Sequence, residues 1–560
     1  MRVFAPAPFR YPVNTGTDYP YGLQDIPSDT LARTLLDAGL VVAPDPGAQT
    51  DTNKRPMSPA APATIASAFV AESEIATLYI DGDSTAQQQW LGTAITVAAD
   101  PVYVKYTLSS HRLTQGCNIN MSGNDQFAFN GYFKADVVDA NTFRLISPDT
   151  GALVQGTPTG SSISLGRPNF MSPRGMTNWL NGQLGEKRFV MPYNGGIGGS
   201  SIADAVSRWS RGPGAVLSSI DGVWLMAGIN EVNAGTLTPS QIIATLQQYH
   251  ALCRAAGKWL YWVLPLGLTS THGSFNATNS LRLRQVWRKA EAYQRTVGTV
   301  GLRILPLWKA FIDPAQTDNR VLTALMQSDG IHPSPSGGQV AAAAIYSLLP
   351  PRKVTRPTIQ SPSDSYDGST SNPHRTSNPF ITTTTGGTAT ANSGTISGSV
   401  PSTITVTVAS GTAAVTLTAP AAADGVGNVL QGVVTLASGT SQINISTASI
   451  SPRMTAGRTY RVRAEVALNN LTGFTSCKVF LSMQIDSVTL DITALDAAIE
   501  TFSQGNLGTF DFESQDIVTT GSTINFANVY VQMTWSGTGV GGTFQIRKLD
   551  LIDVTAIGAE

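Results

Sequence analysis

Ser84 lies in a polar turn, Asp81-Gly-Asp-Ser-Thr85, that directly follows the apolar run Thr77–Ile80. A polar turn at the carboxyl end of a parallel strand is where α/β folds place ligands. A serine hydroxyl becomes a nucleophile only when a nearby base takes its proton. Because a Gly-Asp-Ser sequence alone is more often an ordinary turn, the hypothesis that Ser84 is a nucleophile requires a base elsewhere in the chain.

The candidate base is His332, in the segment Asp329-Gly-Ile-His-Pro333. Of the five histidines, only this one follows an aspartate by three residues in a short turn. That spacing lets Asp329 hold one ring nitrogen while the other faces a nucleophile. The sequence therefore predicts a catalytic group of Ser84, His332 and Asp329. We expect the remaining histidines to be structural or surface residues: His111, His250, His272 and His374.

Two further segments offer hydrogen-bond donors for an oxyanion. The glycine-rich run Asn194-Gly-Gly-Ile-Gly-Gly199 can bring backbone N–H groups close to an anionic atom. Asn230, in Gly228-Ile-Asn-Glu231, carries a neutral amide donor. Each segment also has a simpler interpretation, a flexible loop for the first and a helix-capping or turn asparagine for the second.

Taken together, the four segments resemble the blocks of the SGNH hydrolase family, the GDSL-type esterases. The resemblance implies that Ser84 is the nucleophile, His332 the general base and Asp329 its orienting partner. It also implies an oxyanion hole made of the Ser84 and Gly199 backbone N–H groups and the Asn230 amide, with no metal and no cofactor. The sequence departs from the family pattern at Glu231, where an aspartate is usual, and in the long distance from Ser84 to Gly199.

The elements around these segments alternate between apolar strands and amphipathic helices, which predicts a parallel sheet covered on both faces. With the resemblance, this gives a flavodoxin-like α/β SGNH domain over residues 71–350. The predicted strands are Ile75–Ile80, Arg188–Pro192, Gly222–Ala227, Trp259–Pro265 and Leu302–Leu307. The predicted helices are Met176–Leu184, Ile202–Trp209, Pro239–Ala256, Ser280–Thr296 and Gly337–Leu349.

Other parts of the chain have a different character. Residues 91–165 alternate with period two and predict a small inserted β module beside the active-site mouth. Residues 1–70 are expected to be an attachment segment and linker, and 351–376 a second linker. Residues 377–560 show Thr/Val/Ser alternation without long helical patterns, which predicts an all-β sandwich. Since all four blocks precede Pro350, we expect a chain that ends there to hydrolyse small esters.

Composition excludes several classes of function. The net charge of −1 gives no reason to expect nucleic acid as a partner. No apolar run is long enough to span a bilayer. The three cysteines, Cys117, Cys253 and Cys477, lack metal-site spacing and are expected to be unpaired thiols. The N-terminal residues contain prolines where a signal peptide needs an apolar stretch.

The stretch His111–Gly116, with Asn130–Phe133 and Asp139–Phe143, resembles a small β unit that recurs in phage tail proteins. Ser377–Phe380 and Gly398–Pro401 resemble the opening of jelly-roll modules that follow SGNH domains in phage tail proteins, and Ala456–Arg463 and Phe544–Leu551 resemble carbohydrate-binding jelly rolls. These resemblances imply a virion-associated carbohydrate esterase in a tail fibre or tailspike. It would remove acyl groups, above all O-acetyl, from a bacterial surface polysaccharide. Other tail proteins would bind its N-terminal segment, and the chain would form a homo-oligomer such as a trimer. Trp90 and Trp209 could stack on sugar, although core packing is the commoner fate of tryptophan.

Three alternatives remain open at this point. One is a secreted, extracellular bacterial carbohydrate esterase with a binding module. Another is a non-enzymatic receptor-binding adhesin that retains a hydrolase fold. The third is a phosphatase of the haloacid-dehalogenase type, in which Asp81 would be the nucleophile and Mg²⁺ would be needed.

Overall fold

The computed structural model describes residues 69–557 except 110, 112, 184–188, 351–364, 486–487, 496–501, 515 and 520–522. Before residue 69 it describes only four short strands, β1 (Arg2–Ala5), β2 (Phe9–Tyr11), β3 (Thr17–Tyr19) and β4 (Gly22–Asp25). The expected attachment segment therefore lies almost wholly outside the described residues. None of the helices in the described ranges is long and apolar enough to cross a membrane.

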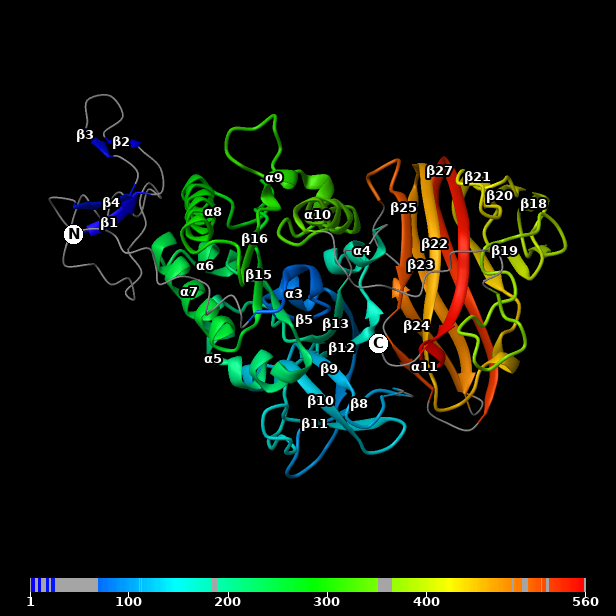
Figure 1. Ribbon diagram of the computed structural model, residues 1–560, viewed down its shortest axis with the longest axis horizontal. Helices are drawn as coiled ribbons and strands as arrows, with labels where there is room; N and C mark the ends of the chain where they lie inside the picture. The colour runs from blue at the N-terminus through cyan, green and yellow to red at the C-terminus, as the bar shows by residue number, and fades with distance from the viewer. Residues whose placement is uncertain are drawn as a thin grey trace.

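A five-stranded parallel sheet forms the centre of the molecule (Figure 1). Its strands are β5 (Thr77–Gly82), β13 (Val190–Asn194), β14 (Gly222–Met226), β15 (Trp259–Val263) and β16 (Leu302–Leu305). They are ordered β13-β5-β14-β15-β16, which is the order of flavodoxin-like sheets. The predicted parallel sheet is confirmed.

Helices cover both faces of this sheet because successive strand residues point to opposite sides. Leu78 and Ile80 belong to the apolar cluster that contains α4 (Met176–Gly182) and α10 (Pro335–Leu348). Tyr79 belongs to the cluster on the other face, with α5 (Ile202–Ser207), α7 (Pro239–Ala255) and α8 (Ala277–Val297). Short helices α3 (Ser84–Gln87), α6 (Ile229–Ala234) and α9 (Trp308–Phe311) follow strands β5, β14 and β16.

The insert between β5 and α4 is a seven-stranded antiparallel sheet with its own apolar core, which includes Tyr106 and Phe133. Its strands are β6 (Trp90–Ala94), β7 (Thr96–Val97), β8 (Lys105–Thr107), β9 (Asn118–Ser122), β10 (Gly131–Val137), β11 (Thr142–Ile146) and β12 (Ser164–Met171). The sheet extends beyond the predicted 91–165 because an irregular pairing joins Met171 to Trp90.

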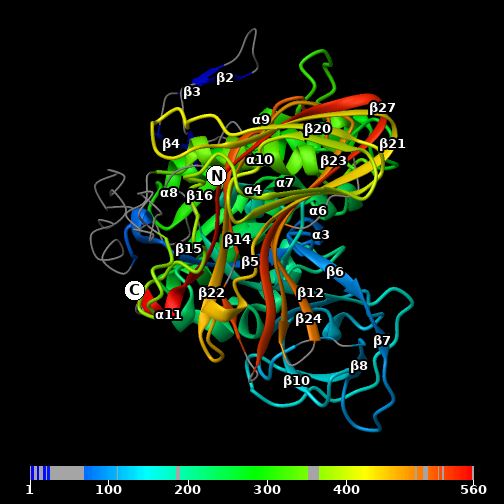
Figure 2. The same cartoon turned by 90° about the vertical axis from the view of Figure 1, so that its right-hand side faces the viewer.

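The C-terminal region, which we call the sandwich, is one connected eleven-stranded sheet organised around the long strands β21 and β27. One half of each strand pairs with β20 and β22, and the other half with β19 and β23. Figure 2 shows β21 and β27 running side by side along the sandwich. The strands are β17 (Thr388–Ala391), β18 (Thr395–Gly398), β19 (Ile404–Ser410), β20 (Ala414–Thr418), β21 (Leu430–Thr447), β22 (Thr459–Thr472), β23 (Phe474–Ile485), β24 (Val488–Leu495), β25 (Gly508–Glu513), β26 (Ile517–Val518) and β27 (Ile524–Asp553), and helix α11 (Val554–Ile557) follows.

The sandwich packs directly on the α/β domain. Trp179 of α4 is fully buried, and its ring meets those of Phe502, Phe510 and Phe512 edge-on at 5.7, 5.0 and 5.7 Å. Gln504 Nε2 donates to the Ser336 carbonyl of α10 at 3.0 Å. This shared core argues against the expectation that a chain ending near Pro350 behaves as an independent enzyme.

The end of the expected second linker is also part of the sandwich. His374 Nδ1 lies 2.7 Å from the buried Asp550 carboxylate, and the Thr376 hydroxyl donates to the same group at 2.6 Å. Arg375 forms a buried ion pair with Asp553 at 2.5 Å. These residues therefore anchor the entry of the chain into the sandwich.

Candidate active site

The turn that carries Ser84 requires a glycine at position 82. Gly82 ends β5 with φ of +134°, and a Cβ there would lie 1.8 Å from the Met226 carbonyl oxygen on β14. Asp83 then caps α3 by accepting a hydrogen bond from the Thr85 N–H at 2.8 Å. Ser84 is thus the first residue of a helix at the carboxyl edge of the sheet, between β5 and β14, where the strand order reverses.

The structure brings Ser84, His332 and Asp329 together. His332 Nε2 lies 2.6 Å from Ser84 Oγ, and His332 Nδ1 lies 2.7 Å from Asp329 Oδ2. Asp329 Oδ1 also accepts the backbone N–H groups of Ile331 and His332, at 3.0 and 3.1 Å. With Nδ1–H donated to the carboxylate, Nε2 is free to accept the serine proton.

The hydrogen bonds to Asp329 keep its carboxylate charged. Partial burial by itself would raise the pKa of this group, but the His332 ring and two backbone N–H groups lower it below its usual value. An ionised Asp329 can stabilise the imidazolium that forms when His332 takes a proton.

The expected oxyanion donors lie at the same edge. Asn230, in α6 after β14, donates one amide hydrogen to the Ser200 carbonyl at 2.9 Å, beside Gly199. Its amide has a second hydrogen to offer. The backbone N–H groups of Ser84 and Gly199 have no acceptor within the described ranges. Gly198 N–H is tied to Gln87 Oε1 of the nucleophile helix at 2.9 Å, which joins the glycine loop to α3.

Glu231, the departure from the family pattern, has a structural role. Its Oε1 accepts the backbone N–H of Ile202, the first residue of α5, at 2.6 Å. The side chain is 5% exposed, and burial raises its pKa, although the hydrogen bond from Ile202 opposes this. The longer side chain of glutamate therefore links the Asn230 segment to the helix that follows the glycine loop.

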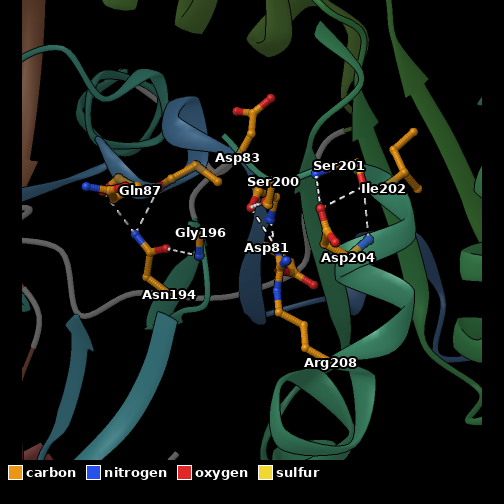
Figure 3. Close-up of polar contacts among 12 residues, drawn as sticks. Asp81, Asp83, Gln87, Asn194, Gly196, Ser200, Ser201, Ile202, Asp204 and Arg208 are labelled. Carbon is orange, nitrogen blue, oxygen red and sulfur yellow. Dashed lines mark hydrogen bonds and ion pairs between the residues drawn. The ribbon is translucent and has the colours of Figure 1, made fainter. Parts of the chain in front are cut away.

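Asp81, the nucleophile of the phosphatase alternative, is fully engaged below the turn (Figure 3). Its Oδ1 accepts from Arg208 at 2.7 Å and from the Gly82 N–H at 2.9 Å, and its Oδ2 accepts from the Tyr249 hydroxyl at 2.7 Å. The side chain is 1% exposed. Because both oxygens are occupied and buried, Asp81 supports the turn and cannot attack a substrate.

Asp83 is a buried carboxyl beside the nucleophile. Burial raises its pKa from 3.8 to about 7, the hydrogen bond from the Thr85 N–H opposes the rise, and the charge of Glu231 adds to it. Folding therefore favours the protonated acid. That contribution to stability is complete below the unfolded pKa of about 3.8 and is lost as the pH rises through about 7.

We therefore expect Asp83→Asn to stabilise the protein at alkaline pH. Asparagine retains the cap acceptor for Thr85 but cannot ionise. The rise in the pKa of Asp83 corresponds to a change in the free energy of unfolding, between low and high pH, on the order of 4 kcal/mol. Thermal unfolding of both proteins should show a gap in melting temperature that widens from pH 4 to 7 and is constant above pH 8. A gap that does not change with pH would contradict the raised pKa.

A small cavity adjoins the candidate site. Three of its lining residues, Thr85, Ile229 and Ile331, are chain neighbours of Ser84, Asn230 and His332. Asp83 also lines the cavity, and the remaining wall is apolar and comes from the ends of β14 and β15, including Ala227, Leu264 and Leu266. The space available is about 20 Å³, which is enough for a group the size of one water molecule.

The other residues singled out in the sequence lie elsewhere. Trp90 is 3% exposed and belongs to the interior, so the suggestion that it stacks on sugar is wrong. Trp209 is half-buried, with its ring 5.4 Å from that of Tyr249. His111, His250 and His272 hydrogen-bond to local backbone or to a tyrosine hydroxyl. The three cysteines form no disulfide.

No protein-family model and no curated protein matches this chain. Among solved structures, a lipolytic protein of the G-D-S-L family from Desulfitobacterium hafniense is 15% identical, with a TM-score of 0.25, over 31% of this chain and 89% of that one. An acetylxylan esterase from Geobacillus stearothermophilus is 18% identical, with a TM-score of 0.23, over 30% of this chain and 77% of that one.

A xylan-binding domain from Paenibacillus barcinonensis is 11% identical, with a TM-score of 0.19, over 27% of this chain and 85% of that one. The chain thus resembles GDSL-type hydrolases and carbohydrate-binding β-sandwich domains, each over part of its length. Likenesses at these scores carry no weight for the activity, which the geometry of the site has to support by itself.

Proposed function

We propose that the chain is a serine esterase that uses Ser84, His332 and Asp329 to remove short acyl groups from a carbohydrate. The observation that carries this proposal is the continuous hydrogen-bonded line from Ser84 Oγ through the His332 ring to Asp329, with separations of 2.6 and 2.7 Å. A serine, a histidine and a carboxylate in this order are the components of acyl transfer through a covalent intermediate.

In the first half of the reaction, His332 Nε2 takes the Ser84 proton as the hydroxyl attacks the ester carbonyl. The negative charge on the carbonyl oxygen is stabilised by the N–H groups of Ser84 and Gly199 and by the Asn230 amide. As the bond from the acyl carbon to the sugar oxygen breaks, the histidine gives its proton to that oxygen, so the sugar leaves as an alcohol and an acyl-serine remains. Water, deprotonated by His332, then attacks the acyl carbon, the bond to Ser84 Oγ breaks, the carboxylic acid leaves and His332 returns the proton to Ser84 Oγ.

The proposed acyl group is acetyl. The small cavity beside Thr85, Ile229 and Ile331, whose wall is mostly apolar apart from Asp83, has room for a group of methyl size, which would favour acetyl over longer acyl chains. In this proposal the sugar part of the substrate binds to the sandwich, whose sequence resembles carbohydrate-binding jelly rolls, and to the insert. This makes the protein a polysaccharide O-deacetylase.

The proposed setting is a phage tail fibre or tailspike that acts on a bacterial surface polysaccharide. The support is the resemblance of the insert and of the C-terminal region to phage tail modules. In this setting the chain lies in the virion, binds other tail proteins through residues 1–70 and assembles as a homo-oligomer such as a trimer. Detection of the protein in purified virions would distinguish this setting from a secreted bacterial esterase.

Acetate release from O-acetylated bacterial polysaccharides tests the enzymatic part of the proposal. The wild type should release acetate, and Ser84→Ala should not. Esters of acetate and of longer acids on one soluble alcohol would test the size of the acyl group. Binding of polysaccharide without acetate release by the wild type would favour the non-enzymatic adhesin.

We expect Asn230→Ala to lower kcat about 10²–10³-fold with a smaller change in KM, because one oxyanion donor is lost only where charge develops. Steady-state kinetics on a soluble acetyl ester would measure both constants. Asn233→Ala, in the same helix α6, is the matched control and should retain the wild-type rate. Near-normal turnover of Asn230→Ala would mean that Asn230 is only a turn residue.

A further inference from the structure

We infer that Asn120, which belongs to the inserted sheet, is a positioning residue for the glycine loop that carries Gly199. The inference rests on the proposed function, because it assigns the insert a part in catalysis by the same site. It comes from a set of buried hydrogen bonds that cross from β9 to the loop after β13.

The glycine loop has too much backbone freedom to keep one conformation by itself. Four of the five residues from Gly195 to Gly199 are glycines, which have the greatest backbone freedom. The loop must also approach the nucleophile helix closely, since a Cβ on Gly196 would lie 2.3 Å from the Gln87 backbone nitrogen. An oxyanion donor is effective only at a fixed distance of about 2.7–3.1 Å, so the loop needs restraints from outside.

Asn120 supplies two of these restraints. Its side chain is 2% exposed, and Nδ2 donates to the carbonyl oxygens of Asn194 and Gly196 at 2.9 and 3.0 Å. An asparagine amide has two hydrogens, so Asn120 uses its full donor capacity on the loop. Because these carbonyls are two residues apart, the amide fixes the path of the chain into Ile197.

The other restraints connect the same loop to the nucleophile. Asn194 Nδ2 donates to the Ala86 carbonyl of α3 at 3.0 Å, and Asn194 Oδ1 accepts the Gly196 N–H at 2.9 Å. Figure 3 shows Asn194 between Gln87 and Gly196. Asn120 therefore restrains a loop that is also hydrogen-bonded to the helix of Ser84. Loss of the Asn120 side chain should change the geometry of the reacting groups.

Asn118 provides a matched control on the same strand. It lies two residues before Asn120, on the same face of β9, and donates to the Pro192 carbonyl at 2.9 Å. That acceptor belongs to β13 and not to the glycine loop. A substitution of Asn118 therefore weakens the docking of the insert without releasing the loop.

The test compares Asn120→Ala, Asn120→Leu and Asn118→Ala in the full chain. We expect both Asn120 variants to lower kcat on a soluble acetyl ester roughly 10- to 100-fold, below the cost of a lost oxyanion donor, with KM changed less than about threefold. Leucine keeps the volume and excludes water, so its effect should be the larger. Asn118→Ala should stay within about threefold of the wild type.

Hydrogen exchange of peptides that cover residues 194–201 separates this inference from the esterase proposal. Exchange should rise in the Asn120 variants and remain at the wild-type level in Asn118→Ala, whether or not the wild type hydrolyses esters. An inactive wild type would overturn the esterase alone. Wild-type exchange and wild-type kcat in either folded Asn120 variant would overturn the role of Asn120. So would a loss of kcat in Asn118→Ala as large as the loss in the Asn120 variants.

Discussion

Ser84→Ala is expected to lower ester hydrolysis by at least about 10⁴-fold, because the variant has no atom that can form the acyl-enzyme. The fold should not change, since the hydroxyl lies at the mouth of the site and its removal leaves no cavity in the core. Steady-state rates on a soluble acetyl ester and a thermal melt of the same preparation would measure both effects. The matched control is Ser207→Ala, an exposed serine of α5, which should behave as the wild type.

His332→Ala should lose as much activity as Ser84→Ala, because a nucleophile and its base act as one unit. A double variant should then be no slower than either single one. Substantial turnover by Ser84→Ala or by His332→Ala would contradict the assignment of these two residues.

Removal of the sandwich is expected to destabilise the α/β domain, in contrast to the modular behaviour that the order of the blocks suggests. A chain ending at residue 350 exposes Trp179, whose ring is covered by Phe502, Phe510 and Phe512. Returning one large aromatic side chain to water costs roughly 2–3 kcal/mol. For a domain of this size that lowers the melting temperature by about 5 °C.

The same truncation removes hydrogen bonds next to the His332 loop. Ser503 N–H donates to the Ser336 hydroxyl at 2.8 Å, and the Ser503 hydroxyl donates to the Ala324 carbonyl at 3.4 Å. We expect lower solubility and a lower rate per folded molecule, measured by melting, sedimentation and active-site titration. Trp179→Gln in the truncated chain should restore solubility. A truncated chain that is monomeric, as stable as the full chain and fully active would contradict this account.

The sequence predicts the α/β elements because their signals are local. Continuous apolar strands such as Gly222–Met226 are buried on both faces of a parallel sheet, and they are bounded by turns. The pair of Asp329 and His332 is predictable for the same reason, since three residues separate the two side chains. The strand β5 begins and ends two residues later than predicted, because Asp81 and Gly82 continue its pairing with β14.

Contacts between distant segments leave no local pattern. Arg208 lies 127 residues from Asp81, and His374 lies 176 residues from Asp550, so spacing gives no sign of either pair. The sequence predicts the helix that contains Trp179 but not that the sandwich covers this side chain. The insert is recognisable from its alternation, whereas the reach of Asn120 to the glycine loop depends on how the insert docks.

Covalent labelling with a serine-reactive organophosphate tests the central claim most directly. The reagent requires a serine hydroxyl activated by a neighbouring base, so it reports on the line from Ser84 to His332 and on no particular substrate. Mass spectrometry of the digested protein should find one equivalent of label on the peptide that contains Ser84, with parallel loss of esterase activity. His332→Ala should not be labelled. Label on a different serine, with activity retained in Ser84→Ala, would contradict the account.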